Sequence, residues 1–209
     1  MGAMRLPAAD GELVQIVDAA LVGAKERAGD WLVCHAGCTQ CCYGAFAINA
    51  LDAARLGEGM RLLRERDGAA AEAIEVRARA WIAEYGAEFP GDSETGRLGK
   101  SEEERERFED FASEAACPAL DVATGLCGVY EWRPMTCRVF GPPVRMEGED
   151  GEGLGHCELC FSGTTAEQVA ACEMPVPHEL EAKVLAEIEA PFPGSAGETV
   201  VAWALVRPS

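Results

Sequence analysis

The sequence predicts a mainly α-helical fold, in which a helical scaffold carries irregular cysteine-rich metal-binding loops and at most a short β-hairpin. Two observations support this fold class. Apolar residues recur at intervals of three and four over several long segments, which is the spacing of a buried helix face. The 10 cysteines of the 209-residue chain gather instead in segments that contain glycine, which suits tight irregular loops. We expect one domain over residues 1–209.

Three helices are expected in the first 90 residues. Apolar positions such as Leu13 and Val17 share one face and predict a helix over about residues 9–28. Asn49 is a plausible N-cap for a second helix through residue 66. A third helix is expected over residues 69–89. The interruption between the two helices near Asp67 predicts that they form an antiparallel pair.

The second half of the chain is expected to mix helices with short irregular pieces. Ser101 and Glu104 form a capping-box pattern, which predicts a charged helix through about residue 115. The turn-like residues 123–125 lie between two apolar runs and predict a short hairpin within 117–130. The remaining expectations are a compact turn over 131–140, loops over 141–143 and 147–155, and closing helices over 165–174 and 178–190.

Charge and hydropathy exclude two classes of partner. The chain has 36 acidic and 18 basic residues and a formal net charge of -18, which repels the phosphates of nucleic acids and anionic lipid headgroups. No apolar run approaches the length needed to cross a membrane. The first 30 residues lack the pattern of a secretory signal, so we expect a cytoplasmic protein with reduced thiols. In that compartment cysteine clusters are more often metal sites than disulfide frameworks.

The densest cysteine run is Cys34, Cys38, Cys41 and Cys42, and Cys117, Cys127 and Cys137 follow at ten-residue spacing. The first three cysteines match the spacing of radical-SAM enzymes, but the chain lacks the strand–helix alternation of their barrel. Side chains of adjacent residues diverge, so Cys41 and Cys42 rarely ligate one ion together. We therefore expect either that one of them lies outside the metal's immediate shell, or that the site holds more than one metal atom.

A third group contains Cys157 and Cys160. Together with His156, these two cysteines could complete a tetrahedral zinc site. Zinc sites usually combine two close cysteine pairs, so a single Cys-x-x-Cys indicates such a site less specifically than two pairs would. Cys172 is expected to be a packing residue on an amphipathic helix, because free cysteine is a common core residue.

The sequence resembles the zinc- or iron-chelating CxxCxxCC family, the YkgJ-like cysteine-cluster proteins. The resemblance rests on the Cys-x-x-Cys-Cys core that begins at Cys38, on Cys117-Pro-Ala-Leu, and on the block from Cys127 to Arg138 with its Arg-Pro-x-x-Cys-Arg ending. Three residues rather than two separate Cys34 from Cys38, which departs from the family pattern. The resemblance covers about residues 30–142 and leaves a helical extension over 143–209.

The resemblance implies bound metal, and a related cysteine-cluster module accompanies flagellin lysine methylation. It therefore implies iron–sulfur chemistry and, as partner, a redox or modification-enzyme protein. Ligation from both cysteine blocks would close a long loop, so metal binding would contribute to folding. Arg133 and Arg138 would lie beside the thiolates, where cations offset negative charge and lower cysteine pKa values. The expected metal ligands are Cys34, Cys38, Cys41, Cys42, Cys117, Cys127, Cys137, Cys157 and Cys160, with Arg133 and Arg138 as cofactor-binding cations.

Two function classes follow from these residues. In the first, the cysteines bind an iron–sulfur cluster used for electron transfer or in a modification enzyme; in the second, they bind zinc or a single iron with a structural or metal-handling role. The adjacent cysteine pair favours the first class. So does the number of cysteines, which exceeds the four ligands that a single tetrahedral metal ion needs. No Ser-His-Asp order, Walker loop or Gly-x-Gly-x-x-Gly fingerprint occurs, so no catalytic residue is assigned. His35 is read either as a ligand or base or as an exposed loop residue.

Overall fold

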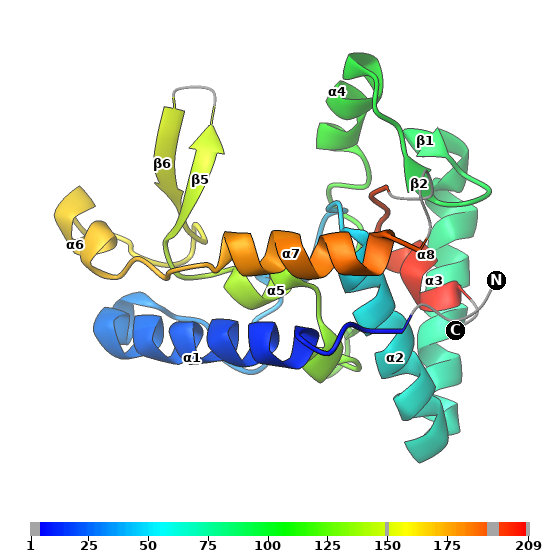
Figure 1. The fold of residues 1–209 in the computed structure, drawn as a ribbon, viewed down its shortest axis with the longest axis horizontal. Helices are drawn as coiled ribbons and strands as arrows, with labels where there is room; N and C mark the ends of the chain where they lie inside the picture. The colour runs from blue at the N-terminus through cyan, green and yellow to red at the C-terminus, as the bar shows by residue number, and fades with distance from the viewer. Residues whose placement is uncertain (1–4, 149–150, 192–196, 208–209) are drawn as a thin grey trace. The chain divides into compact units, whose positions relative to one another are not determined.

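Helices account for 54% of the computed structural model, which describes residues 5–148, 151–191 and 197–207 (Figure 1). The predicted mainly helical fold is confirmed. The described helices are α1 (Asp10–Ala28), α2 (Ala50–Arg66), α3 (Gly68–Tyr85), α4 (Glu102–Asp110), α5 (Met135–Val139), α6 (Ala166–Ala171), α7 (His178–Glu189) and α8 (Val201–Val206). Short 3-10 helices lie at Gly29–Trp31, Gln40–Cys42, Gly86–Glu88 and Tyr130–Trp132.

The strands of the described residues form three antiparallel pairs. They are β1 (Gly91–Asp92) with β2 (Arg97–Leu98), β3 (Leu120–Asp121) with β4 (Leu126–Cys127), and β5 (Val144–Gly148) with β6 (Gly151–Gly155). The β3–β4 pair is the short hairpin that the sequence predicts. The predicted loop over 147–155 is wrong in its described part, because β5 and β6 pair there with Val144 opposite Gly155. Residues 149 and 150 of that loop lie outside the described residues.

The physical reason for this correction is backbone pairing. Glycine is depleted in strands, so a segment rich in glycine and acidic residues favours a loop on local propensity. Here the ladder hydrogen bonds form regardless of side-chain preference. The sulfur of Met146 lies 2.2 Å from where a Cβ on Gly155 would stand, so the missing side chain leaves room for Met146.

The chain divides into two compact units. Unit 1 comprises the described residues of 37–134 and 185–209 together with residues 5 and 6, and unit 2 comprises residues 7–36 and 135–184. The expectation of one domain over 1–209 stays a prediction.

Unit 1 is built around the predicted helix pair, in which α2 and α3 lie side by side (Figure 1). The Asn49 side chain caps α2 by accepting the Asp52 N–H at 3.0 Å. Asp67 ends α2 and caps α3, since its carboxylate accepts the Ala70 N–H at 3.0 Å. The Asn49 cap confirms the predicted start of α2, and Asp67 lies at the predicted interruption between the helices, whereas α3 ends at Tyr85 rather than at residue 89.

Helix α8 packs against both α2 and α3 and is almost wholly buried. The sequence does not predict this helix, because a six-residue apolar run has no periodicity that distinguishes a helix from a buried strand. Trp203 is its largest side chain and lies with its ring centroid 4.4 Å from Phe89 and 5.9 Å from Trp81. These aromatic rings form the centre of one hydrophobic cluster of unit 1.

The charged helix α4 begins at the predicted capping box but ends sooner than expected. Ser101 and Glu104 exchange hydrogen bonds as the motif requires. The helix stops at Asp110 rather than near residue 115, and Ala112 then adopts a left-handed conformation with φ of 51°. A left-handed residue cannot continue an α-helix, so the chain turns toward the second cysteine block.

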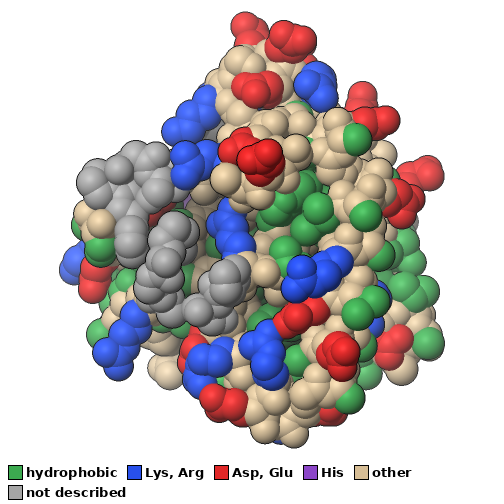
Figure 2. Space-filling model, turned by 90° about the vertical axis from the view of Figure 1, so that its right-hand side faces the viewer, with side chains coloured by type: hydrophobic (Ala, Val, Ile, Leu, Met, Phe, Trp, Pro, Cys, Tyr) green, Lys and Arg blue, Asp and Glu red, His purple; other side chains and the backbone are tan. Residues whose placement is uncertain are grey.

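The surface carries both signs of charge. Figure 2 shows basic and acidic side chains intermingled on one face. None of the helices in the described ranges is long and apolar enough to cross a lipid bilayer.

Two glycines on α2 give a matched test of packing. A Cβ on Gly59 would stand 2.5 Å from the Trp132 ring, whereas a Cβ on Gly57 would meet nothing within 4 Å. We expect Gly59→Ala to destabilise the protein by about 1–3 kcal/mol, because Trp132 must move. Gly57→Ala should stabilise it by about 0.5–1 kcal/mol through helix propensity. Urea denaturation checks both values, and equal effects would contradict the close packing of Trp132 on α2.

Candidate metal centre

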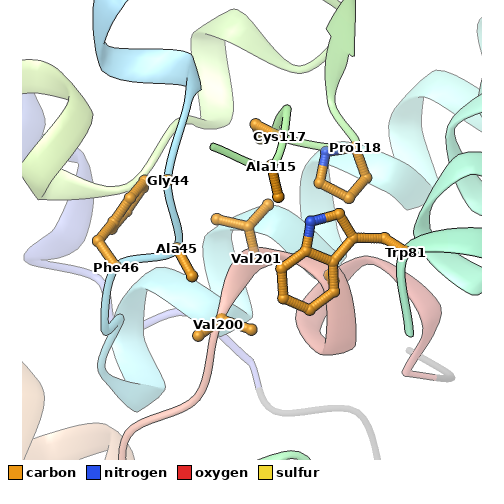
Figure 3. Close-up of a pocket in the computed structure, with 10 residues that line it drawn as sticks. Gly44, Ala45, Phe46, Trp81, Ala115, Cys117, Pro118, Val200 and Val201 are labelled. Carbon is orange, nitrogen blue, oxygen red and sulfur yellow. The ribbon is translucent and has the colours of Figure 1, made fainter. Parts of the chain in front are cut away.

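The two cysteine blocks meet through their backbones in unit 1. Cys41 and Cys42 lie on the 3-10 helix Gln40–Cys42. The Cys42 carbonyl accepts the Cys117 N–H at 2.7 Å, and the Gly44 N–H donates to Ala115 at 3.0 Å. These bonds join segments about seventy residues apart in a local antiparallel contact between Tyr43 and Ala116. Figure 3 shows the two segments around a small cavity.

The β3–β4 hairpin brings two further cysteines together. Cys127 pairs with Leu120 across the hairpin, and the Leu120 N–H donates to the Cys117 carbonyl at 2.9 Å. Gly125 has φ of +70°, and a Cβ there would stand 3.0 Å from the Gly37 carbonyl oxygen. A glycine is therefore needed where the hairpin approaches the first cysteine loop.

Four thiols of unit 1 form one interacting set. In every pair among them, one thiol shifts the pKa of the other, through a hydrogen bond between Cys41 and Cys42 and through charge in the other pairs. The members of this tetrathiol set are Cys41, Cys42, Cys117 and Cys127. All four are half-buried. Within the described part of the chain, none of these thiol–thiol interactions includes Cys38, which precedes the 3-10 helix in the same loop.

The hydrogen bond between adjacent thiols sets the electrostatics of the set. The Cys42 thiol donates to the Cys41 sulfur, which lowers the pKa of Cys41 from 9.0 to about 6. The same bond, with burial, raises the pKa of Cys42. Whether Cys41 and Cys42 ligate the same metal atom stays a prediction. Burial raises the pKa of Cys117 to about 12 and is also the main cause that raises the pKa of Cys127.

Arg133 places a positive charge beside this set. Its guanidinium interacts electrostatically with Cys41 and Cys127 and lowers the pKa of both. The side chain is 8% exposed, donates to the Tyr130 carbonyl at 3.0 Å and lies 4.0 Å above the Tyr130 ring. The predicted proximity of this arginine to thiols is thus present in unit 1.

The other predicted ligands lie in unit 2. Cys34 and Cys160 have their sulfur atoms 3.9 Å apart, and Cys157 and Cys172 belong to the same buried cluster. Cys137 is half-buried on α5. The five cysteines of unit 2 are Cys34, Cys137, Cys157, Cys160 and Cys172. The sequence does not predict this division, because neighbouring cysteines in one run carry no local signal that tells which unit each belongs to.

Arg138, His35 and His156 have partners of other kinds. The Arg138 guanidinium binds the Asp18 carboxylate on α1 at 2.7 and 2.9 Å, and only 2% of the arginine is exposed. Its role in cofactor binding stays a prediction. His156 and His35 are exposed, and each ring Nδ1 lies 2.9–3.0 Å from a backbone carbonyl oxygen, of Cys157 and Ala36 respectively. Contacts with backbone carbonyl oxygens do not by themselves assign either histidine the role of a base.

The donors of the tetrathiol set fit a thiophilic metal. Sulfur from cysteine is the preferred ligand of zinc and of iron–sulfur clusters. As the side chains stand, no group of three or more His, Cys, Asp or Glu residues within the described ranges is arranged to hold a metal ion. Metal binding would therefore require these thiols to rearrange.

The neighbouring cavity does not add a substrate site. It measures about 20 Å³ and is lined mainly by apolar residues such as Phe46, Trp81 and Val201 (Figure 3). This volume accommodates about one water molecule.

Comparison with known proteins gives one match. A family model named CxxCxxCC and described as "Putative zinc- or iron-chelating domain" matches residues 33–160, which is more than half of the chain. The match extends beyond the range of about 30–142 that the motifs indicate and so takes in Cys157 and Cys160. No curated protein and no solved structure matches the chain.

Proposed function

Because the chain belongs to the CxxCxxCC family, we propose that its tetrathiol set binds an iron–sulfur cluster that serves in electron transfer or in a modification enzyme. The observation that supports this is the mutual interaction of four thiols drawn from two distant blocks. Cysteine thiolates are the usual ligands of such clusters. When bound, the cluster would supply one-electron redox chemistry or Lewis acidity.

The chain's own residues suit this role in three ways. The hydrogen bond from Cys42 and the nearby charge of Arg133 lower the pKa of Cys41, which favours its thiolate form. Arg133 offsets part of the negative charge that four thiolates accumulate. The four thiols are half-buried rather than enclosed, and Tyr130 beside Arg133 is 55% exposed. A redox or modification-enzyme partner would therefore reach this side of unit 1.

Zinc, or a single iron, is the second candidate for the same residues. The set contains four thiols, which is the ligand number of a closed tetrahedral Cys₄ zinc site. In that case the metal would hold the two cysteine blocks together and serve a structural or metal-handling role.

Anaerobic purification distinguishes these candidates. On the iron–sulfur proposal, the protein is coloured and contains iron and acid-labile sulfide in equal amounts, and dithionite bleaches its visible absorption. A colourless protein whose tetrathiol set holds zinc would refute the cluster and leave the structural role. Iron without sulfide would indicate a mononuclear site.

Replacement of Arg133 tests its charge effect on the bound cluster. Reduction adds negative charge, so a nearby cation favours the reduced form. Arg133→Gln should lower the reduction potential by roughly 50 mV, given that about 59 mV corresponds to 1.4 kcal/mol for one electron. Arg133→Lys keeps the charge and should restore most of the potential. Equal potentials in Arg133→Gln and the parent protein, measured by redox titration, would show that the arginine only packs.

A further inference from the structure

The thiols of Cys34 and Cys160 lie next to each other in unit 2, although 126 positions separate them along the chain. Their sulfur atoms are 3.9 Å apart, which is the distance of a weak hydrogen bond between thiols. Both cysteines are present as thiols, and a disulfide bond between them would measure about 2.05 Å. Rotation about the two Cα–Cβ bonds moves the sulfur atoms far enough to close this gap.

Backbone hydrogen bonds hold together the two segments that carry these thiols. The Phe161 N–H, one residue after Cys160, donates to the carbonyl of Trp31, three residues before Cys34, at 2.9 Å. The Cys160 N–H donates to the Cys157 carbonyl at 2.9 Å in the same turn. Phe161 is left-handed with φ of 59°, a conformation that a bulky residue keeps only where its surroundings hold it. The turn therefore keeps Cys160 in a fixed place beside Cys34.

Gly141 makes room for the sulfur of Cys34. It has φ of +126°, and a Cβ there would stand 2.9 Å from the Cys34 sulfur. Its carbonyl accepts the Cys157 N–H at 3.2 Å, which joins it to the turn that carries Cys160. A side chain at position 141 would push the Cys34 sulfur away from its present position.

The two thiols differ in their access to solvent. Cys160 is 2% exposed within a hydrophobic cluster, whereas Cys34 is half-buried at the edge of that cluster, between the exposed residues Val33 and His35. Redox-sensing cysteines are typically accessible to the oxidant and lie next to a second, resolving cysteine. In a reducing compartment, such as the sequence predicts for this chain, disulfides are usually transient and catalytic or redox-sensing. The exposure of the pair therefore suits oxidation that begins at Cys34.

We propose that Cys34 and Cys160 form a site of reversible oxidation by hydroperoxides, with Cys34 as the reacting thiol and Cys160 as the resolving thiol. The Cys34 sulfur attacks one oxygen of hydrogen peroxide, so that an S–O bond forms and the O–O bond breaks. The hydroxide that leaves takes up the Cys34 proton as water. The Cys160 sulfur then attacks the Cys34 sulfur, which forms the S–S bond, and the hydroxyl group leaves with the Cys160 proton as a second water. The two sulfur atoms lose two electrons in all, and the peroxide gains them.

The resulting bond closes a long loop of the chain. It joins the two ends of the matched range 33–160 and so lowers the entropy of the unfolded chain. We expect the oxidised protein to melt at a higher temperature than the reduced protein. A small dithiol reverses the reaction by attacking the disulfide at Cys34, where solvent has access, and is itself oxidised while both protein thiols return.

Peroxide treatment of the full chain, purified with the metal it carries, tests the proposal. After a small molar excess of hydrogen peroxide, peptide mass mapping should find Cys34 joined to Cys160 in a species lighter by two hydrogen atoms, and dithiothreitol should restore both thiols. In Cys160→Ala the bond cannot form, so Cys34 should persist as a sulfenic acid that dimedone traps. Cys157→Ala is the matched control from the same turn and should still form the bond. A Cys157–Cys160 bond instead, or no bond in either the parent chain or the control, would overturn the assignment.

A measurement on the parent chain covers variants that fail to fold. Before oxidation Cys34 should be alkylated faster than Cys160, and after oxidation neither should react until a reductant is added. Resistance of both thiols to alkylation and to peroxide until a chelator removes metal would show that they are metal ligands, and would overturn the proposal. The reaction uses none of the thiols of the tetrathiol set. Absence of a cluster there would therefore refute the proposed function while the Cys34–Cys160 bond still forms.

Discussion

Cys117→Ser is expected to weaken metal binding by the tetrathiol set by more than about 10–100-fold, the loss of affinity that outer-shell changes cause, because it removes a direct ligand. Cys117 is the thiol that links the hairpin to the first cysteine loop, because its N–H is bonded to the Cys42 carbonyl. Loss of metal also removes the binding free energy that stabilises the folded chain. The melting temperature of the metal-loaded protein should therefore fall together with its metal content.

Cys38→Ser is the matched control for this prediction. Cys38 lies in the same half-buried loop but outside the interacting set. We expect the serine variant to keep most of its metal and its melting temperature. Elemental analysis of the two variants, prepared side by side, decides the matter. Equal loss of metal in both would place Cys38 among the ligands and would refute the four-residue assignment.

Trp203→Ala should destabilise unit 1 by about 3–5 kcal/mol, the usual cost of removing a buried tryptophan from a packed core. Trp203 is 4% exposed and contacts the rings of Phe89 and Trp81. Its Nε1–H also donates to the Ser93 carbonyl at 3.2 Å, which tethers the β1–β2 turn to α8. Both the aromatic packing and this tether are lost in the alanine variant.

Trp203→Phe separates these two contributions. Phenylalanine keeps an aromatic ring in the cluster but cannot donate to Ser93. The expected cost is smaller, about 1–2 kcal/mol, because a hydrogen bond and part of the ring contact are lost. Guanidinium denaturation monitored by circular dichroism gives both values. A loss below 1 kcal/mol in Trp203→Ala would show that α8 is not part of the cooperative core.

Local sequence signals placed most of the helices. Asn49 predicts the start of α2 and makes the capping bond expected of it, and Asp67 lies at the interruption predicted between α2 and α3. Such signals are readable because a cap bonds a backbone group only two or three residues away. The prediction of a loop over 147–155 was wrong, because the β5–β6 pairing depends on cross-strand hydrogen bonds that a glycine-rich sequence does not indicate. Helix α8 was missed for the related reason that burial on all sides leaves no periodicity.

The sequence likewise determined some features of the candidate sites, and the tertiary structure decided the others. By itself the sequence determined the family, the two cysteine blocks and the nearness of Arg133 to thiols, because residue type and spacing carry that chemistry. Only the tertiary structure decided that Cys41 and Cys42 join Cys117 and Cys127, while Cys34 lies with Cys160. The physical reason is that a thiol reaches only a few ångströms from its backbone. Which thiols meet therefore depends on long-range backbone contacts, such as the bond between Cys117 and Cys42, that no local pattern records.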